Sequence, residues 1–153
     1  MPIDTIIEEK DVTLATLSVE LERATIANQA RSDHSLYVNE PGMFPFWVEI
    51  REGVRFILLH SYLDFVPELD EAERLEFCDR VNQQLYLPTV LVRRIEREGE
   101  DEGDSFRLVG NYPIYYRDGL LSSHFIRLCR LFSDGMKRFE AEFDPEHERV
   151  KEL

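Results

Sequence analysis

The side chains of this 153-residue chain that could do chemistry are few and widely spaced. The four histidines are His34, His60, His124 and His147. No two of them have the spacing of metal ligands on one face of a predicted helix. His60 precedes Ser61 in a predicted strand, where neighbouring side chains point to opposite faces, so this pair cannot serve as base and nucleophile. We therefore expect no catalytic residue, no metal site and no cofactor.

The two cysteines, Cys78 and Cys129, lie far apart in separate helical patterns, and the sequence has no Cys-x-x-Cys motif. Such cysteines are typical of buried free thiols in a reducing cytoplasm. We expect free thiols here, and a disulfide between the two is the alternative.

Acidic side chains crowd the segment 96–104, a composition that raises the question of a calcium site. The segment lacks the alternating ligands and the terminal bidentate glutamate of an EF-hand loop, so a solvated loop between two strands is the favoured interpretation. The sequence also contains no dinucleotide-binding motif, P-loop or nucleophile elbow.

A basic and aromatic patch could be formed on two neighbouring strands by Arg93, Arg94, Arg97, Arg107 and Tyr112. Binding to nucleic acid would require such a patch. The nearby carboxylates and the net charge of −13 oppose this function, and ion pairs across the strands are favoured instead.

The bulk composition narrows the class of protein further. Hydrophobic residues make up 43% of the chain, as in globular proteins, and the length suits one domain with a sizeable core. A net charge of −13 repels nucleic acid and anionic membranes and attracts basic partners. The first ten residues do not resemble a signal peptide, and no stretch approaches the roughly 20 apolar residues of a membrane span, so we expect a cytoplasmic protein.

These side chains must be positioned by the elements around one stretch, Phe44–Tyr62. Two β-branched and aromatic runs flank a polar break containing Gly53, which predicts a β-hairpin. The first run alternates apolar and polar residues, whereas the second, around Phe56–Leu59, is apolar at both parities. The second run is therefore predicted to be a central strand with both faces covered.

Other periodic patterns complete a predicted α+β domain spanning 1–153. Its order is α-βββ-α-ββ-α, with about five mainly antiparallel strands and three helices. Helices are expected near 11–28, where Asp11 or Thr13 can cap the helix, near 70–86, and at 121–143, where apolar and aromatic residues form a stripe. Strands are expected at 35–38, as a short edge strand, at 88–97 and at 105–117. Residues 1–10 are expected to be a lead-in, 28–34 a loop, and 144–153 a charged tail that frays.

Trp47 is the first candidate for a binding residue. It has the parity opposite to Phe46 and Val48, so it is either exposed for a partner or covered by the N-terminal helix. Phe44 and Phe46 are expected to add apolar area beside it. Such an exposed patch would mark an interaction surface made of Phe44, Phe46 and Trp47.

From Phe46 to Phe143 the chain resembles YbjN-domain proteins, a bacterial group of proposed sensory transduction regulators. The likeness lies in the hairpin, in the helix end at 81–88 with Asn82, in the strand end at 115–120 with its Gly119 corner, and in the long last helix. Asn82 lies on an apolar stripe, so its amide is expected to satisfy nearby backbone groups.

YbjN-like domains are similar in fold to type III secretion chaperones, which are small, acidic, usually dimeric proteins that bind extended protein segments. The resemblance implies a homodimer and no catalytic residues. By analogy, the dimer interface would lie on the second helix and the strand after it, at Phe77, Val81, Val90 and Val92.

The favoured hypothesis is a non-enzymatic protein-binding module, a chaperone-like adaptor or regulator whose partner is basic or handles nucleic acid. The alternative is a small-ligand sensor or an enzyme with a pocket between the sheet and the last helix. That pocket would be lined by Tyr112, Tyr115, Tyr116 and His124. Direct binding of nucleic acid is the least favoured hypothesis.

Overall fold

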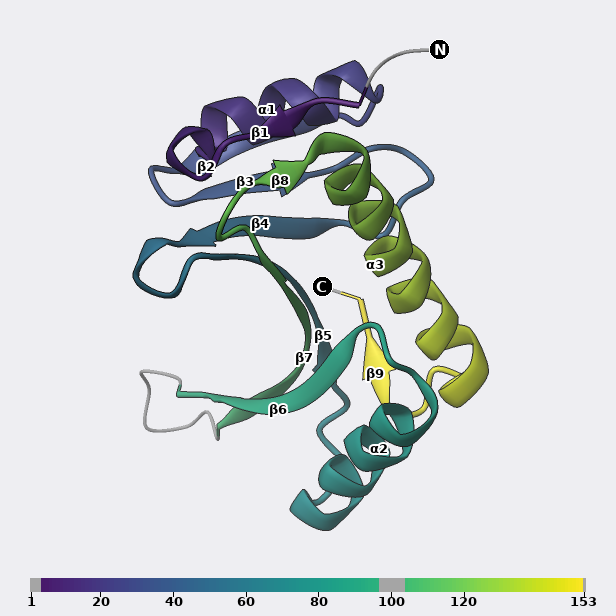
Figure 1. Cartoon of the computed structure of the whole chain (residues 1–153). Coiled ribbons are helices and arrows are strands. Elements are labelled where there is room, and N and C mark those ends of the chain that lie inside the picture. Colours follow the sequence, from purple (N-terminus) through teal and green to yellow (C-terminus); the bar gives the residue numbers. More distant parts are fainter. Residues whose placement is uncertain (1–3, 97–103, 153) are drawn as a thin grey trace. The chain divides into compact units, whose positions relative to one another are not determined.

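The computed structural model describes residues 4–96 and 104–152 and shows an α+β architecture (Figure 1). The described part has three α-helices, as the sequence predicts: α1 (Leu14–Arg23), α2 (Glu71–Gln84) and α3 (Ser122–Phe143). Its main strands are β2 (Asn28–Ser32), β3 (Ser35–Val38), β4 (Phe46–Arg51), β5 (Phe56–Phe65), β6 (Thr89–Ile95) and β7 (Ser105–Tyr115). Three two-residue strands complete the set: β1 (Ile6–Ile7), β8 (Leu120–Leu121) and β9 (Val150–Lys151).

Within the described residues, the main sheet has seven strands, in the order β2-β3-β4-β5-β7-β6, with β9 pairing beside β5. Every pairing with a defined register is antiparallel. The predicted α+β class is therefore confirmed, but the sheet is larger than the five strands expected. The added strands are β2, in the segment expected to be a loop, and β9, in the tail expected to fray.

Close contacts divide the chain into two compact units, and three elements run through both. The first unit comprises Met1–His60 and Tyr112–Asp134, and the second comprises Ser61–Asn111 and Gly135–Leu153. The division falls within β5, β7 and α3. We describe each unit by itself, and the single domain spanning 1–153 stays a prediction.

In the first unit, α1 begins at a capping box and contacts β2 and β3 (Figure 1). The Thr13 side chain accepts from the Thr16 backbone N–H, and the Thr16 hydroxyl accepts from the Thr13 backbone N–H. This reciprocal pair satisfies two backbone donors that a helix start leaves open. The predicted cap is thus confirmed at Thr13, and the helix buries Leu17 and Leu21.

The core of the first unit lies on one face of its strands. Val48 lies opposite Leu36, and Phe46 lies opposite Val38, so all four side chains share a face. All four are buried, and the ring of Phe132 on α3 lies 5.4 Å from the ring of Phe46. Helix α3 covers Ser122–Phe143, so the last helix predicted at 121–143 is confirmed.

Two expectations about this edge of the sheet were wrong. The segment 28–34 is strand β2 over Asn28–Ser32, although its polar residues have little tendency to form strands. Its backbone pairs with β3, and the Asn28 amide oxygen accepts a 2.7 Å hydrogen bond from the Ser18 hydroxyl. Tertiary pairing thus overrides local preference, and β3 lies inside the sheet rather than at its edge.

β5 differs from the prediction of a strand covered on both faces. Its buried and half-buried residues alternate strictly along all ten positions. The face that contains Ile57 and Leu59 is buried, whereas Phe56, Leu58 and His60 on the other face are only half-buried. The prediction that both faces of this strand are buried was therefore wrong, although apolar side chains point to both faces.

In the second unit, α2 begins at a capping box made by Asp70 and Glu73, contacts β6 and ends before Pro88. Just inside its C-terminal end, the Asn82 side chain bonds both backbone groups of Val90. Its amide nitrogen donates to the Val90 carbonyl, and its amide oxygen accepts from the Val90 N–H, both at 2.8 Å. This geometry confirms the structural role expected for Asn82.

Gly135 on α3 allows a close approach of the helix to the backbone of Leu87 and Pro88. A Cβ at this position would lie 2.9 Å from Pro88 Cδ, and it would also overlap the Leu87 carbonyl oxygen. The side-chain-free surface of Gly135 is therefore needed for the helix to pack on the segment that follows α2.

Gly135→Ala is expected to lower the free energy of unfolding by about 1–3 kcal/mol, the usual result of overpacking. The added Cβ meets backbone and proline atoms that cannot rotate away. Urea unfolding followed by circular dichroism would measure the change. Gly53→Ala is the matched control, because no heavy atom lies within 4 Å of a Cβ at Gly53. A stabilisation of about 1 kcal/mol by Gly135→Ala, as helix propensity alone favours, would contradict the close approach.

Candidate functional site

Trp47 lies on the face of β4 opposite to the core, as its parity predicts. Its side chain is half-buried, whereas its neighbours Phe46 and Val48 are fully buried on the other face. In the pairing of strands, Trp47 lies opposite Tyr37 on β3 and opposite His60 on β5. The three residues therefore form a row across three strands of the first unit, which we call the aromatic ladder.

The rings of the aromatic ladder are in contact. The centroids of Tyr37 and Trp47 are 4.8 Å apart with an interplanar angle of 43°. Those of Trp47 and His60 are 6.0 Å apart with an angle of 15°, so these two rings are nearly parallel. Cross-strand pairs of this kind stabilise a sheet, and here they also hold Trp47 in a fixed orientation.

Charged groups lie at both ends of the aromatic ladder. The guanidinium of Arg31 lies over the Tyr37 ring, 4.8 Å from its centroid. At the other end, Glu49 Oε2 lies 3.4 Å from His60 Nε2 and Glu49 Oε1 lies 3.3 Å from Arg51 Nε. The surface thus combines a rigid aromatic centre with a cation at one end and a carboxylate at the other.

The aromatic ladder is suited to binding more than to catalysis. Tryptophan and tyrosine on a half-open face supply a large contact area with little conformational freedom to lose. His60 faces Glu49, while Ser61 is buried on the opposite face of β5. The adjacent histidine and serine are therefore separated, as the alternation of strand side chains predicts.

The structure corrects part of the predicted surface. Phe44 and Phe46 do not add exposed area beside Trp47, since they are 6% and 0% exposed. The Phe44 backbone N–H donates a 2.7 Å hydrogen bond to Ser133 Oγ, which fixes this segment against α3. Tyr37 and His60 take their place as neighbours of Trp47. These two neighbours depend on the registers of the β3–β4 and β4–β5 pairings, which the irregular connections between the strands do not reveal in the sequence.

The residues expected at a dimer interface lie in the second unit. Phe77, Val81 and Val90 are buried within the single chain, so they have almost no surface to offer a second copy. Val92 is half-buried. Nearby on the same elements, Leu75 and Leu91 are 53% and 38% exposed. Leu91 lies on the face of β6 opposite to Val92, whereas Leu75 and Val92 line one hollow. Dimerisation itself stays a prediction, with Leu75 and Val92 as its remaining apolar surface.

The pocket of the alternative hypothesis is not assembled from its four residues. Tyr116 is buried at 1% exposure and Tyr115 is exposed at 69%, where its ring contacts Phe56. His124 lines a large hollow of the first unit, and the other described residues that line this hollow include three arginines and no tyrosine. The tyrosines therefore do not define a common ligand pocket.

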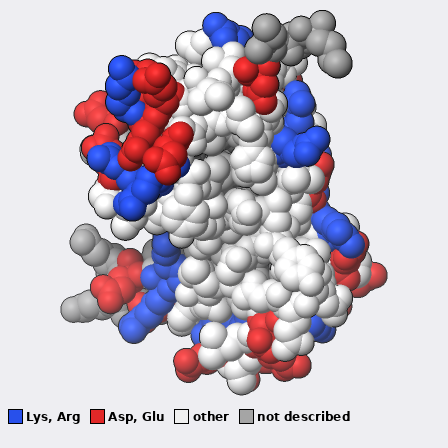
Figure 2. All heavy atoms as spheres, in the orientation of Figure 1, with Lys and Arg blue, Asp and Glu red and all other residues white. Residues whose placement is uncertain are grey.

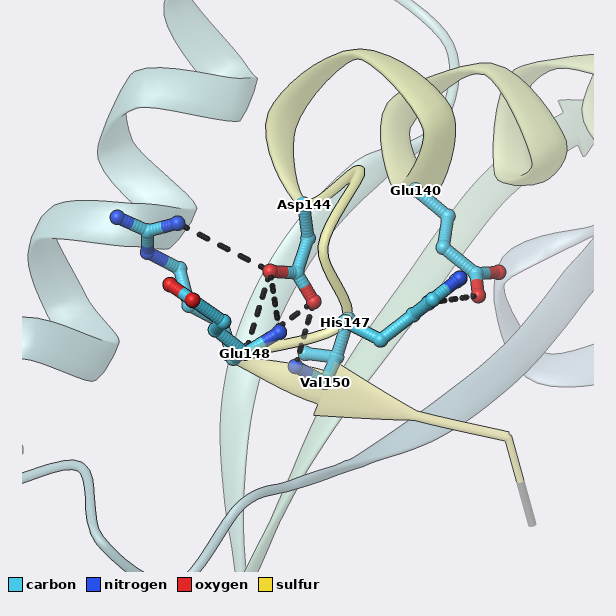
Figure 3. Close-up of polar contacts among 6 residues, drawn as sticks. Glu140, Asp144, His147, Glu148 and Val150 are labelled. Carbon is cyan, nitrogen blue, oxygen red and sulfur yellow. Dashed lines mark hydrogen bonds and ion pairs between the residues drawn. The ribbon is translucent and has the colours of Figure 1, made fainter.

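A group of titratable side chains in the second unit lies where α3 ends (Figure 3). The buried Asp144 carboxylate accepts hydrogen bonds of 2.9–3.1 Å from the backbone N–H groups of Glu148, Arg149 and Val150. These bonds fold the tail back, so that Val150 pairs with Phe65 on β5. The tail expected to fray is thus held by a carboxylate whose oxygens already have donors.

A second carboxyl, Glu140, belongs to the same group (Figure 3). His147 Nδ1 lies 3.4 Å from Glu140 Oε1. Burial raises the pKa of the Glu140 carboxyl, the negative charges of Glu152 and Asp144 raise it further, and His147 opposes them. A raised pKa can mark an acid catalyst. Because no nucleophile joins this pair in the described contacts, we interpret the group as structural.

The cysteines are free and buried, as predicted. Burial raises the pKa of the Cys78 thiol to about 12 and raises the pKa of Cys129 as well. Both thiols are therefore protonated at neutral pH and are poor nucleophiles.

Two arginines of the predicted basic patch have acidic partners. Arg94 forms an ion pair with Asp104, and Arg107 Nε lies 3.1 Å from Asp64 Oδ1. Figure 2 shows basic side chains interspersed with acidic ones on the face drawn. Arg97 and most of the acidic segment 96–104 lie outside the described residues.

Within residues 4–96 and 104–152, no cluster of three or more His, Cys, Asp or Glu side chains has the arrangement of a metal site. None of the helices in this described part is long and apolar enough to cross a membrane.

The fold places this chain in a class of α+β proteins with a large antiparallel sheet and three helices. No protein-family model and no curated protein matches the sequence. Among solved structures, the chain is similar to the crystal structure of YbjN from E. coli, a proposed transcription regulator. The TM-score is 0.64 at 16% identity, over 90% of this chain and 94% of that chain. The YbjN-like fold predicted from the sequence is therefore confirmed, and the likeness at this identity concerns the fold alone.

Glu140→Gln is expected to raise the free energy of unfolding at about pH 8. The folded-state pKa of Glu140 is above the ordinary value of 4.5. The contribution of protonated Glu140 to the free energy of unfolding is therefore fully present below pH 4.5. It is lost as the pH rises through the folded-state pKa. Glutamine remains neutral throughout, so the gain should vanish as the pH falls to about 4.

Urea unfolding across this pH range measures the effect. Glu142→Gln is the control, because the exposed Glu142 carboxylate forms a surface pair with Arg138 at 2.8 Å. A loss of stability at every pH in Glu140→Gln would show that its contact with His147 outweighs the burial of charge.

Proposed function

We propose that this chain is a non-enzymatic protein-binding module, a chaperone-like adaptor or regulator that binds an extended segment of a partner protein on the aromatic ladder. One observation carries the proposal: Trp47 is held between Tyr37 and His60 on the half-open face of the sheet. Ordered aromatic residues on a surface are frequent anchors of protein interfaces.

The charge of the chain supports a basic partner. A net charge of −13 attracts positively charged proteins over a distance of about 10 Å at ordinary salt concentrations. Proteins that handle nucleic acid carry such basic segments. This partner class also suits the fold neighbour, which is a proposed transcription regulator.

We further propose that the protein acts as a homodimer in the cytoplasm. The surface would lie on α2 and β6, with Val92 half-buried and Leu75 exposed, and these two residues line the same hollow. Apolar side chains of this kind favour self-association when they form one patch. The small-ligand alternative is supported by a different observation, the hollow beside His124.

Trp47→Ala is expected to weaken partner binding by about 30-fold, the effect of losing an anchor worth about 2 kcal/mol, without unfolding the protein. The partner is first isolated from native cell extract by affinity capture at low and high salt, with mass spectrometry, and its affinity for purified variants is then measured. A basic partner should be released at high salt.

Tyr86→Ala is the matched control, because Tyr86 is an aromatic residue with 96% exposure outside the ladder. Thermal melting shows whether each variant is folded. Unchanged affinity in a folded Trp47→Ala variant would overturn the assignment of the surface, as would an equal loss in Tyr86→Ala.

The dimer is tested by sedimentation equilibrium. We expect twice the mass of one 18.1 kDa chain, and Leu75→Asp should shift the equilibrium toward the monomer, because it places a charge on the proposed apolar surface. A wild-type mass equal to one chain at all concentrations would rule out the homodimer.

A further inference from the structure

Helix α1 and the start of α3 line a hollow of about 740 Å³ in the first unit. Its size is in the range of pockets that bind small molecules. Three arginines and a histidine contribute to the lining: Arg23, His124, Arg127 and Arg130. This concentration of basic side chains is unexpected in a chain with a net charge of −13.

The charges of two arginines in the hollow are not neutralised. Arg127 is exposed and has no ion pair or hydrogen bond within the described residues. Arg130 donates a 3.2 Å hydrogen bond to the Ala24 carbonyl, a neutral acceptor that leaves the positive charge uncompensated. The two residues are three positions apart on α3, so their side chains lie on the same side of the helix.

The acidic residues that line the hollow already have ion-pair or hydrogen-bond partners within the chain. Glu20 Oε1 lies 3.4 Å from Arg23 Nη1, and the Glu20 side chain is only 12% exposed. Asp4 accepts hydrogen bonds from the hydroxyls of Ser122 and Ser123 and from the Ser123 backbone N–H. These bonds lower the pKa of the Asp4 carboxyl and occupy donors at the N-terminus of α3. The donors that remain for a ligand are therefore those of the arginines.

We propose that this hollow binds a phosphorylated small molecule, with its phosphate groups on Arg127 and Arg130. Planar guanidinium groups match phosphate oxygens and form strong charge-assisted hydrogen bonds. Leu121, which is 46% exposed, and Ile126 provide an apolar surface for the rest of the ligand. The bound carboxylates of Asp4 and Glu20 and the overall negative charge disfavour a long polyanion such as nucleic acid.

Isothermal titration calorimetry with pyrophosphate, ADP and adenosine tests the proposal at low salt. Pyrophosphate and ADP should bind, and adenosine, which has no phosphate, should not. Arg127→Gln should weaken ADP binding about tenfold or more, as expected for the loss of a hydrogen bond between charged groups. Since Arg127 has no partner among the described residues, this variant should fold normally.

Arg138→Gln is the control, because it removes the same charge from α3 at a site outside the hollow. It should bind ADP like the wild type. Absence of pyrophosphate and ADP binding at millimolar concentrations would overturn the proposal, and so would equal binding by Arg127→Gln. Binding of a single-stranded oligonucleotide in preference to ADP would assign the arginines to nucleic acid instead.

Discussion

The alternating burial of β5 is the constraint on which the rest of the structure depends. Along the whole strand, every second side chain is buried, and the intervening side chains are only half-covered. A strand shows this pattern where one face packs into the core and the other is half-open to solvent. In the first unit the open face holds Trp47 and His60, so the same constraint that forms the core also exposes the candidate binding surface.

Two polar side chains of this protein, Asn82 and Asp144, form hydrogen bonds with the backbone and so fix the positions of nearby segments. Asn82 bonds both backbone groups of Val90, and Asp144 accepts three backbone N–H groups of the tail. Each replaces bonds to water that burial removes, and an unsatisfied group at either place would be destabilising. These side chains have the chemistry of functional residues, but their hydrogen-bonding capacity is already taken by the backbone.

The distribution of charge separates two kinds of surface. The chain as a whole is strongly acidic, which favours basic macromolecular partners. The hollow between α1 and α3 is locally basic, since its carboxylates are bound and Arg127 and Arg130 are not neutralised. A small anion can use this local field, whereas a large one also meets the repulsion of the surrounding charge. Protein binding and anion binding would therefore occupy different surfaces of the first unit.

The sequence by itself determined the α+β class, the three helices, a cap near the start of the first helix, and the burial of one side of the last helix. These features follow from local periodicity and from side chains that bond their own neighbouring backbone. Tertiary structure decided what depends on partners distant in the chain. Strand β2 and the tail strand β9 form because other strands and Asp144 supply their hydrogen bonds, against their own polar composition. The aromatic ladder and the arginine hollow likewise needed the register of three strands and the packing of two helices, which no local pattern contains.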